Sequence, residues 1–219
     1  MNYIDGLAAE FAAVIGTAPY PQLHARLGDV ALLGDMIARP GVLQTGHFRL
    51  LSGLHADRFL AFSHVARDRD LLELVADWLS PTVAAWSADV VMAPSTAGVA
   101  LASTLSRRLG AQLHLASLDE AGRAAGILGR SEFDGLRVLL VNDVVTTGQG
   151  FEALADLVRS NQGVVAGAAW FLSRSDADIG ALLDAPTAYL GDLPLPAWDP
   201  GGCPVCATSE ALQDALDLN

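Results

Sequence analysis

The feature that most constrains the fold is a regular alternation of short apolar runs with amphipathic segments after residue 88. The apolar runs predict strands at 88–93, 111–116, 136–141 and 164–171. Two helices are predicted between them, one stopped by Gly110 and one closed by Gly163. Because these strands are apolar throughout rather than at alternate residues, we expect an α/β fold with a parallel sheet covered by helices on both faces.

The part of the chain before residue 88 predicts a smaller lobe of helices and turns. Apolar residues at helical spacing predict amphipathic helices at 2–15 and 68–79. Pro and Gly interrupt residues 20–46, which favours short helices and turns there. The tail is rich in Pro and Gly and is expected to cross the surface. We therefore divide the chain into an N-terminal hood lobe, an α/β core and a tail, at residues 1–65, 66–192 and 193–219.

Charge and composition limit the partners of this chain. Its 219 residues carry a formal net charge of −12, which argues against nucleic acid, since basic side chains supply most of that affinity. All 13 basic residues are arginine, so any task usually given to a lysine needs another group. No apolar run approaches the roughly 20 residues of a membrane span, and the N-terminus lacks a basic leader. We expect a cytoplasmic protein without a membrane partner.

The strand at 136–141 ends in the stretch NDVVTTGQG, which leads directly into a helix. Ligands of open α/β sheets bind at the carboxyl ends of strands, and the first amides of a helix attract anions. Asn142 and Asp143 are placed to accept hydrogen bonds from sugar hydroxyls. A phosphate can be surrounded by the hydroxyls and amides of Thr146, Thr147, Gly148, Gln149 and Gly150. The Gly-Lys-Ser/Thr of a Walker loop is missing, and an ordinary strand–turn–helix cap stays an alternative on these residues alone.

This stretch resembles the phosphoribosyl pyrophosphate (PRPP) motif of the type I phosphoribosyltransferases, in which apolar residues precede two acids and a Thr/Gly loop. Three further segments are similar to that family in the same order along the chain. The first, TGHFRLLSGLHADRFLAF (45–62), is similar to the N-terminal segment of orotate enzymes. The second, VVMAPSTAGVALASTLS (90–106), is similar to the strand and loop that hold pyrophosphate. The third, WFLSRSD (170–176), is similar to the segment whose Arg meets the base. The resemblance covers about residues 40–175 and implies the family's fold, an α/β core under an N-terminal hood.

The resemblance also implies a role for each matching residue. Residues 146–150 would hold a 5′-phosphate, Asn142 and Asp143 would meet the ribose at the catalytic centre, and Arg174 would bind the base. Pyrophosphate would be held by the backbone amides of Ser95, Thr96, Ala97 and Gly98. The implied reaction moves a 5-phosphoribosyl group between PRPP and a nitrogen of a heterocycle, with Mg²⁺ bridging pyrophosphate and ribose oxygens. Members of the family usually dimerise, so we expect a homodimer that buries part of residues 40–62.

Two departures from the family pattern keep other functions open. Asn142 replaces the family's first acid, which removes a negative charge from a site that should stabilise a cationic sugar. The loop expected at 117–135 contains only Arg123 and Arg130 against four acids, the wrong sign for capturing a polyanion. Arg123 is the candidate catalytic clamp. The alternatives are a non-catalytic sensor of a nucleotide or PRPP, and an enzyme that hydrolyses or phosphorolyses a nucleoside monophosphate.

Cys203 and Cys206 are the only cysteines and have the spacing of half a zinc site. Structural zinc takes four ligands, and the five histidines show no metal spacing, so we expect no metal ligands in the chain itself. A relic of a Cys-Pro-x-Cys motif found in some orotate-like members and a zinc shared across a dimer are the alternatives. We expect His47 and His55 to be structural, with contact to a ligand as the alternative. For Arg174 the alternative is a surface position.

Overall fold

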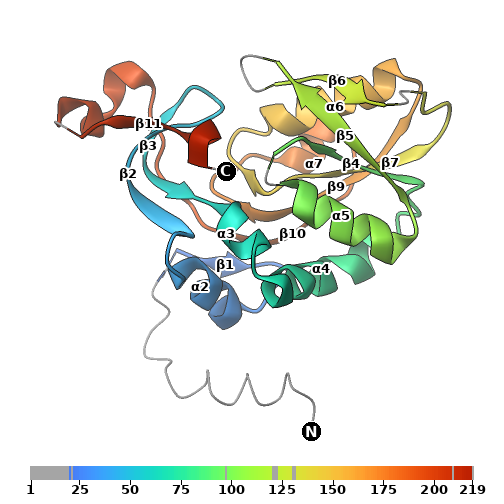
Figure 1. The fold of residues 1–219 in the computed structure, drawn as a ribbon, viewed down its shortest axis with the longest axis horizontal. Coiled ribbons are helices and arrows are strands. Elements are labelled where there is room, and N and C mark those ends of the chain that lie inside the picture. The colour runs from blue at the N-terminus through green and yellow to red at the C-terminus, as the bar shows by residue number, and fades with distance from the viewer. Residues whose placement is uncertain are drawn as a thin grey trace, which may run out of the picture.

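The computed structural model describes residues 20, 22–96, 98–119, 123–129, 132–208 and 210–218. The helix predicted at 2–15 lies outside these residues. The described chain forms an α/β core built on an eight-stranded sheet, and a hood built on a three-stranded sheet. Figure 1 shows the hood strands at the left of the view, with the core to their right.

The core sheet is parallel in its centre and antiparallel at its edges. Its order is β1 (His24–Ala25), β10 (Thr187–Asp192), β9 (Val164–Ser173), β7 (Arg137–Val141), β4 (Val90–Pro94), β5 (Gln112–Leu118) and β6 (Ala124–Leu128), with β8 (Val144–Val145) also pairing with β9. The strands from β10 to β5 run parallel, whereas β1 and β6 are antiparallel to their neighbours. The four strands predicted from apolar runs are β4, β5, β7 and β9, which confirms the predicted sheet.

Helices cover both faces of this sheet, which explains why its central strands are apolar on both sides. One face packs against α2 (Val30–Ala38), α3 (Phe62–Ala66), α4 (Arg69–Ala84) and α5 (Gly98–Leu109), and the other against α6 (Gln149–Ser160) and α7 (Ile179–Leu183). Gly110 has a φ of 65° directly after α5, as expected for a residue that ends a helix. None of the helices within the described part of the chain has the length and apolar run needed to span a bilayer.

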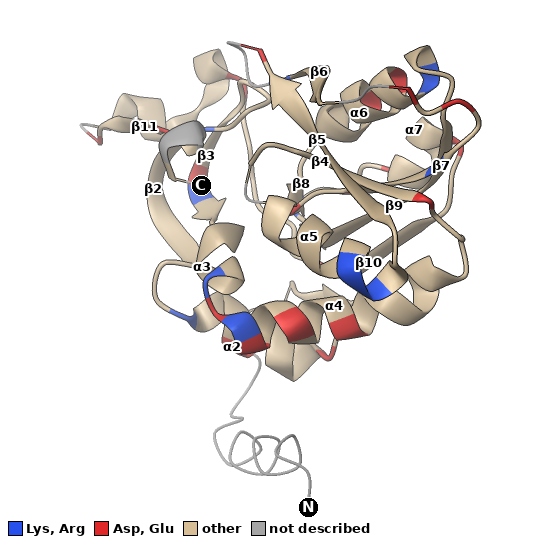
Figure 2. Ribbon diagram, turned by 45° about the vertical axis from the view of Figure 1, so that its right-hand side comes forward, with Lys and Arg blue, Asp and Glu red and all other residues tan. Residues whose placement is uncertain are grey.

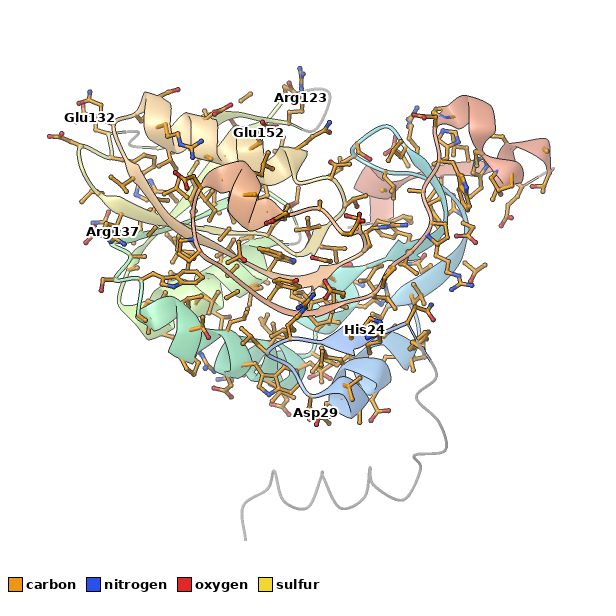
Figure 3. All side chains as sticks on the ribbon, turned by 180° about the vertical axis from the view of Figure 1, so that it is seen from behind. His24, Asp29, Arg123, Glu132, Arg137 and Glu152 are labelled. Carbon is orange, nitrogen blue, oxygen red and sulfur yellow. The ribbon has the colours of Figure 1, made fainter. Side chains whose placement is uncertain are left out.

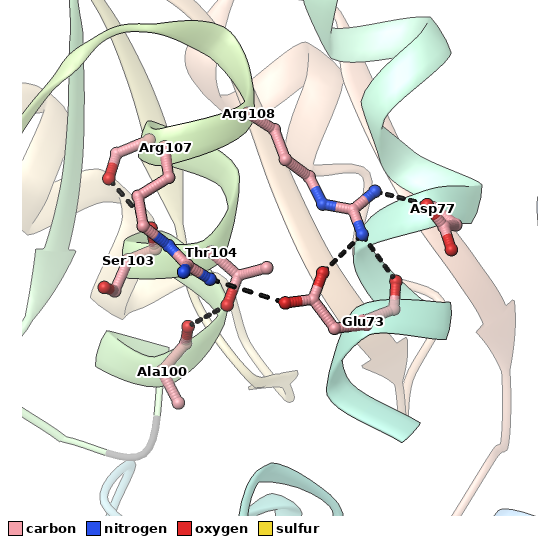
Figure 4. Close-up of polar contacts among 8 residues, drawn as sticks. Glu73, Asp77, Ala100, Ser103, Thr104, Arg107 and Arg108 are labelled. Carbon is pink, nitrogen blue, oxygen red and sulfur yellow. Dashed lines mark hydrogen bonds and ion pairs between the residues drawn. The ribbon is translucent and has the colours of Figure 1, made fainter. Parts of the chain in front are cut away.

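Ion pairs join α4 to α5 on the outer face of the core. Figure 2 shows the basic last turn of α5 beside acidic turns of α4. As Figure 4 shows in detail, Arg108 donates to the side chains of Glu73 and Asp77 and, at 3.2 Å, to the Glu73 carbonyl. The hydrogen bond from Arg108 holds the pKa of the Glu73 carboxyl below its ordinary value. These contacts fix the position of α5, whose first residues approach the candidate site.

Helix α4 is longer than the sequence predicts. Asp68 caps it by accepting hydrogen bonds from the amides of Asp70 and Leu71, and the helix continues past Pro81 to Ala84 rather than ending at 79. A proline removes one helical hydrogen bond, but Val83 beyond it is fully buried in the core. Burial of the apolar stripe therefore extends the helix past the proline.

The hood sheet combines two distant parts of the chain. It contains β2 (Leu43–Arg49), β3 (His55–Leu60) and β11 (Leu212–Asp214), with β11 parallel to β2. The tail crosses the surface as predicted, since residues 199–202, 204 and 206–208 are exposed, but it also packs onto the hood. Trp198 exchanges two backbone hydrogen bonds of 2.8 Å with His55, and Cys203 is buried. Pro and Gly exclude long regular elements but not packing, and here they form the short helices η1 (Pro200–Gly202) and η2 (Pro204–Ala207).

The division of the chain at residues 65 and 192 stays a prediction. In the structure, one strand from each outer part of the chain pairs with a strand across a predicted boundary. Strand β1 comes from the predicted hood and pairs with β10 of the core. Strand β11 comes from the predicted tail and completes the hood. The prediction of a continuous loop at 117–135 is wrong in part, since β5 extends to Leu118 and β6 pairs with it as an antiparallel hairpin. The five residues of β6, AAGIL, include three small ones, and Ala and Gly are weak strand formers.

Candidate functional site

The middle of the core sheet brings two strand ends together. Strand β7 lies between β4 and β9, so the segments that follow β4 and β7 leave the same edge side by side. Their meeting point is Asn142. A Cβ added to Gly98, at the start of α5, would lie 3.1 Å from the Asn142 Cα, and one added to Gly150, in α6, 3.5 Å from its Nδ2. Both helices therefore begin against Asn142.

The loop between β8 and α6 is held tightly against the end of β9. Val145 pairs with Ser173, and the hydroxyl of Ser175 donates to the Thr146 carbonyl. Gly148 has a φ of 85°, and a Cβ there would lie 2.7 Å from the Cδ1 of Ile179. Both the backbone angle and the close approach require glycine at this position.

An anion can approach the start of α6 directly. The first amides of a helix have no partner within it and carry partial positive charge. The residues beside these amides are exposed: Thr147, Gln149 and Gly150. The structure thus places the predicted phosphate loop as an open donor surface at a helix N-terminus.

A cavity of about 1000 Å³ lies between this loop and the hood. The hood contributes the β2–β3 turn, including Leu50–Gly53, while the core contributes residues 142–153 and Arg174. Asp214 and Ala215, at the end of the chain, complete the lining. The volume is in the upper range for small-molecule sites, which are commonly about 300–1,000 Å³.

Asp143 is the acid at the strand end. It is 8% exposed and lines the cavity. Burial raises the pKa of the Asp143 carboxyl above its ordinary value, although hydrogen bonds from the amides of Val144 and Asp143 itself act in the opposite direction. The backbone amide of Asp143 also donates to the Asn142 Oδ1 at 2.9 Å. Backbone hydrogen bonds therefore hold the Asp143 carboxyl in place, and burial shields it from water. A positive charge in the cavity would stabilise its ionised form.

Arg174 is buried, so the alternative of a surface arginine is wrong. It is 3% exposed and donates to the carbonyls of Arg58 at 3.3 Å and Pro196 at 3.2 Å, which joins core, hood and tail. Burial lowers the pKa of Arg174 to about 10, while the charge of Asp57 opposes that change. Its Nε, like the Oγ of Ser52, is buried with no hydrogen-bond partner among the described residues. Both residues line the cavity, where a polar ligand can satisfy such atoms.

The other arginines that line the cavity carry acidic partners. Figure 3 shows Arg123 near the outer end of the β5–β6 hairpin, where its Nε and Nη2 donate to Asp119 at 3.1 and 3.0 Å. On the hood side, the Nε of Arg49 donates to Asp214 at 3.1 Å. Arg130 lies outside the described residues. Positive charge near the cavity is thus largely balanced before any anion binds.

The loop after β4 fits its predicted role only in part. The amide of Ser95 donates to the Ala116 carbonyl at 3.0 Å, and that of Thr96 to the Pro94 carbonyl at 2.8 Å. In this conformation both amides already have backbone partners, so their role towards pyrophosphate stays a prediction and requires these hydrogen bonds to change. Ala97 lies outside the described residues. Gly98 keeps its predicted place at the strand end through its contact with Asn142.

A second group of polar side chains converges outside this cavity. One ligand-type atom from each of His47, His55, Cys203 and Cys206 lies within 4.8 Å of the others. The expectation of no metal ligands in the chain itself did not anticipate this cluster, whose side chains could hold a metal ion. Their spacing along the chain gives no sign of the cluster, because folding of the tail onto the hood creates it.

Comparison with known proteins gives a consistent picture. Residues 65–178 match the phosphoribosyl transferase domain. The orotate phosphoribosyltransferase of Pelotomaculum thermopropionicum is 32% identical over 168 residues, which cover 77% of this chain and 87% of that protein. The enzyme of the same name from Thermus thermophilus is 29% identical over 180 residues, covering 82% and 97% respectively.

Solved structures show the same fold at lower sequence identity. The orotate phosphoribosyltransferase from Aeropyrum pernix superposes with a TM-score of 0.57 at 21% identity, covering 73% of this chain and 91% of that one. A phosphoribosyltransferase from Corynebacterium diphtheriae gives a TM-score of 0.57 at 21% identity, covering 73% and 92%.

Burial of Asp143 leads to a prediction about stability and pH. Because its pKa is raised in the folded state, its contribution to stability is fully present below its unfolded pKa and is lost as pH rises through the folded pKa. Asp143→Asn removes this dependence. The variant should therefore melt at about the same temperature as the parent in acid, and at a higher temperature near neutral pH.

Differential scanning fluorimetry across pH tests this expectation. Asp134→Asn, at an exposed position, is the matched control and should show no such trend. A melting temperature for Asp143→Asn below that of the parent at neutral pH would show that the carboxylate is stabilised by its surroundings.

Proposed function

Because the chain belongs to the phosphoribosyl transferase family, we propose that it moves a 5-phosphoribosyl group between PRPP and a nitrogen of a heterocyclic base. The observation that carries this proposal is the cavity itself. Its lining includes Thr146 and Thr147 before the start of α6, Asn142 and Asp143 at the strand end, and Arg174, which donates to the hood carbonyl of Arg58. A phosphate, a ribose and a base can each find a matching group within this one cavity.

The 5′-phosphate is proposed to bind at the start of α6. Its charge interacts favourably with the partial positive charge of the helix, and its oxygens accept hydrogen bonds from exposed amides and from the hydroxyls of Thr146 and Thr147. Ser175 and β9 hold the loop in position before the ligand arrives. Binding therefore costs little reorganisation of the loop.

Asp143 is proposed to stabilise the reacting sugar. The transition state of such a transfer is oxocarbenium-like and carries positive charge, which a carboxylate screened from water stabilises strongly. The charge also favours the ionised form of Asp143 and opposes the effect of burial. Asn142 contributes hydrogen-bonding capacity but no charge, so the site has half the negative charge implied by the family motif.

Asn142 and Asp143 also fit the family's use of Mg²⁺, since that ion is commonly held by one or two carboxylates together with substrate phosphates. When bound, Mg²⁺ neutralises part of the pyrophosphate charge. Asp143 would hold this ion through its carboxylate, with Asn142 as a neutral oxygen donor beside it. The chain itself supplies few other charges for this purpose.

Arg174 is proposed to orient the base. Its guanidinium is fixed by two carbonyls, and its buried Nε has no hydrogen-bond partner among the described residues. A carbonyl or carboxylate oxygen on the base would satisfy this donor, and the hydroxyl of Ser52 can provide a second contact. The curated relatives are named for orotate, which carries such groups.

The balance of charge favours a second candidate function. A PRPP enzyme must hold a leaving pyrophosphate, yet Arg123 is paired with Asp119, and Arg49 with Asp214. An enzyme that hydrolyses or phosphorolyses a nucleoside monophosphate needs the same phosphate loop without a pyrophosphate clamp. Exposed ion pairs are weak, so a polyanion can still draw Arg123 away from its partner. We therefore keep PRPP as the first candidate and expect its binding to be weak.

Two further properties remain proposals. We propose a homodimer that buries part of residues 40–62, where Leu51 exposes 47% of its surface. Sedimentation velocity at micromolar concentration should give the mass of two chains, and a monomer under these conditions contradicts the proposal. The cytoplasmic location stays a prediction.

Thr147→Val tests the phosphate site. Losing one hydrogen bond to a charged group costs about 1.5–3 kcal/mol, so ligands with a 5′-phosphate should bind roughly ten- to a hundredfold more weakly. Binding is measured by calorimetry or thermal shift with PRPP plus Mg²⁺ and with nucleoside monophosphates. Thr45→Val makes the same change at an exposed position on β2 and should leave affinity unchanged. Equal affinities of Thr147→Val and the parent for every such ligand would remove residue 147 from the site.

Arg123→Ala separates the two candidate functions. If Arg123 clamps the pyrophosphate, the variant should lose about ten- to a hundredfold in PRPP affinity and its pyrophosphate release with a base, yet keep nucleoside monophosphate binding. Arg67→Ala, at an exposed position on another element, is the control. Tight Mg²⁺-dependent PRPP binding that is indifferent to Arg123→Ala shows that other groups hold the pyrophosphate. Hydrolysis of a nucleoside monophosphate without PRPP turnover supports the second function.

A further inference from the structure

The cluster of His47, His55, Cys203 and Cys206 lies outside the proposed transfer site and has no part in that reaction. His47 is on β2, His55 begins β3, and the two cysteines belong to the turn that contains η2. We propose that these four side chains bind one structural Zn²⁺ ion, which fastens the tail to the hood. This inference does not depend on the proposed function.

Four of the six distances within the cluster are close to those of a tetrahedral zinc centre, and the other two are within 4.8 Å. The His47 Nε2 lies 3.1 Å from the His55 Nδ1, 3.4 Å from the Cys206 Sγ and 3.7 Å from the Cys203 Sγ. The His55 Nδ1 lies 3.2 Å from the Cys206 Sγ. With Zn–N near 2.0–2.1 Å and Zn–S near 2.3 Å, a tetrahedron has edges of about 3.3 Å between nitrogens and about 3.6 Å between nitrogen and sulfur. The side chains are thus already spaced as ligands of one ion.

The backbone brings these ligands together by a specific route. Trp198 pairs with His55 on β3, and farther along the chain Leu212 pairs with His47 on β2. The segment between residues 198 and 212 must therefore cross from one strand of the hairpin to the other. Cys203 and Cys206 lie on that crossing, where their sulfurs reach both imidazoles.

A contact behind His47 sets its ring for metal binding. Its Nδ1 lies 3.3 Å from the carbonyl of Glu210, to which it donates when it carries the proton. That tautomer leaves the Nε2 lone pair free and directed at the other three ligands. Metal-bound histidines usually make such a bond through their second nitrogen. The tail therefore supplies both two ligands and the group that orients a third.

Hydrogen bonding without a metal explains the cluster less well. The His55 Nδ1 is within 3.2 Å of both the His47 Nε2 and the Cys206 Sγ, yet it carries at most one proton for two contacts. Two imidazoles and two thiols held this close are ordinary for a metal centre, since Cys₂His₂ is a common structural zinc set.

A two-iron cluster with mixed ligands does not fit the distances. In such a centre both histidines bind one iron and both cysteines bind the other. The bridging sulfides then separate the nitrogens from the cysteine sulfurs. Here the His47 Nε2 is within 3.7 Å of both sulfurs, so one ion must be shared by all four ligands.

The ion would stabilise the part of the hood that lines the cavity. His47 and His55 stand on either side of the β2–β3 turn, and Leu50–Gly53 of that turn line the cavity. The tail leads from the cysteines to Asp214 and Ala215, which line it as well. One zinc ion thus connects both hood segments that face the ligand.

Metal analysis of the full chain tests the proposal. The protein is purified without a polyhistidine tag or chelator, and its metals are measured by plasma mass spectrometry. About one zinc per chain is expected, with a fall in melting temperature when a strong chelator removes it. Cys206→Ser should lose most of the zinc. His24→Ala, at an exposed position on β1 (Figure 3), should retain it.

A second measurement decides the case even if Cys206→Ser does not fold. The zinc of the parent protein is replaced by Co²⁺, which should give the intense visible absorption of a tetrahedral cobalt–thiolate centre. Zinc far below one per chain together with no cobalt spectrum overturns the proposal. Three other results would also overturn it. They are a Cys203–Cys206 disulfide found by mass spectrometry in freshly purified protein, iron in place of zinc, and full zinc content in a folded Cys206→Ser variant.

Discussion

The backbone ladder that holds β7 between β4 and β9 is the interaction on which the candidate site depends. Leu139 and Leu140 on β7 are fully buried, one on each face, so its register is fixed by packing on both sides. That register delivers Asn142 to the point where α5 and α6 begin. A shift by one residue would exchange the buried faces and move Asp143 away from the cavity.

The central strands and the strand–loop–helix turn at residues 142–150 could be predicted from the sequence because each is local. Burial on both faces makes a strand apolar along its whole length, and the loop places its donors on consecutive residues, 146–150. The histidine–cysteine cluster, the burial of Arg174 and the addition of β11 to the hood could not be predicted in this way. They depend on contacts between residues more than 100 positions apart, which leave no periodic pattern.

Pairing of cations with acids gives the cavity an unusual electrostatic character. Arg49 and Arg123 are partly neutralised by neighbours, whereas Arg174 keeps its charge in a buried position with carbonyls as its partners. Long-range attraction for anions is therefore weak, and recognition rests on short-range hydrogen bonds to groups already in place. Such a site discriminates by shape and donor position more than by charge.

Completion of the hood by residues 198–214 has a consequence for the order of events during synthesis. The core strands and the phosphate loop have all left the ribosome once residue 192 has emerged, and domains generally fold as units as the chain is made, at about 5–20 residues per second. Hairpin β2–β3 emerges early but must wait for β11, which is translated after all the core strands. Until then the apolar face formed by Phe48, Ala56 and Phe59 lacks its contact with Ala215. During this interval the nascent chain has a complete set of core strands and an incomplete hood. The exposed apolar face of the hood is then the surface that a chaperone would bind.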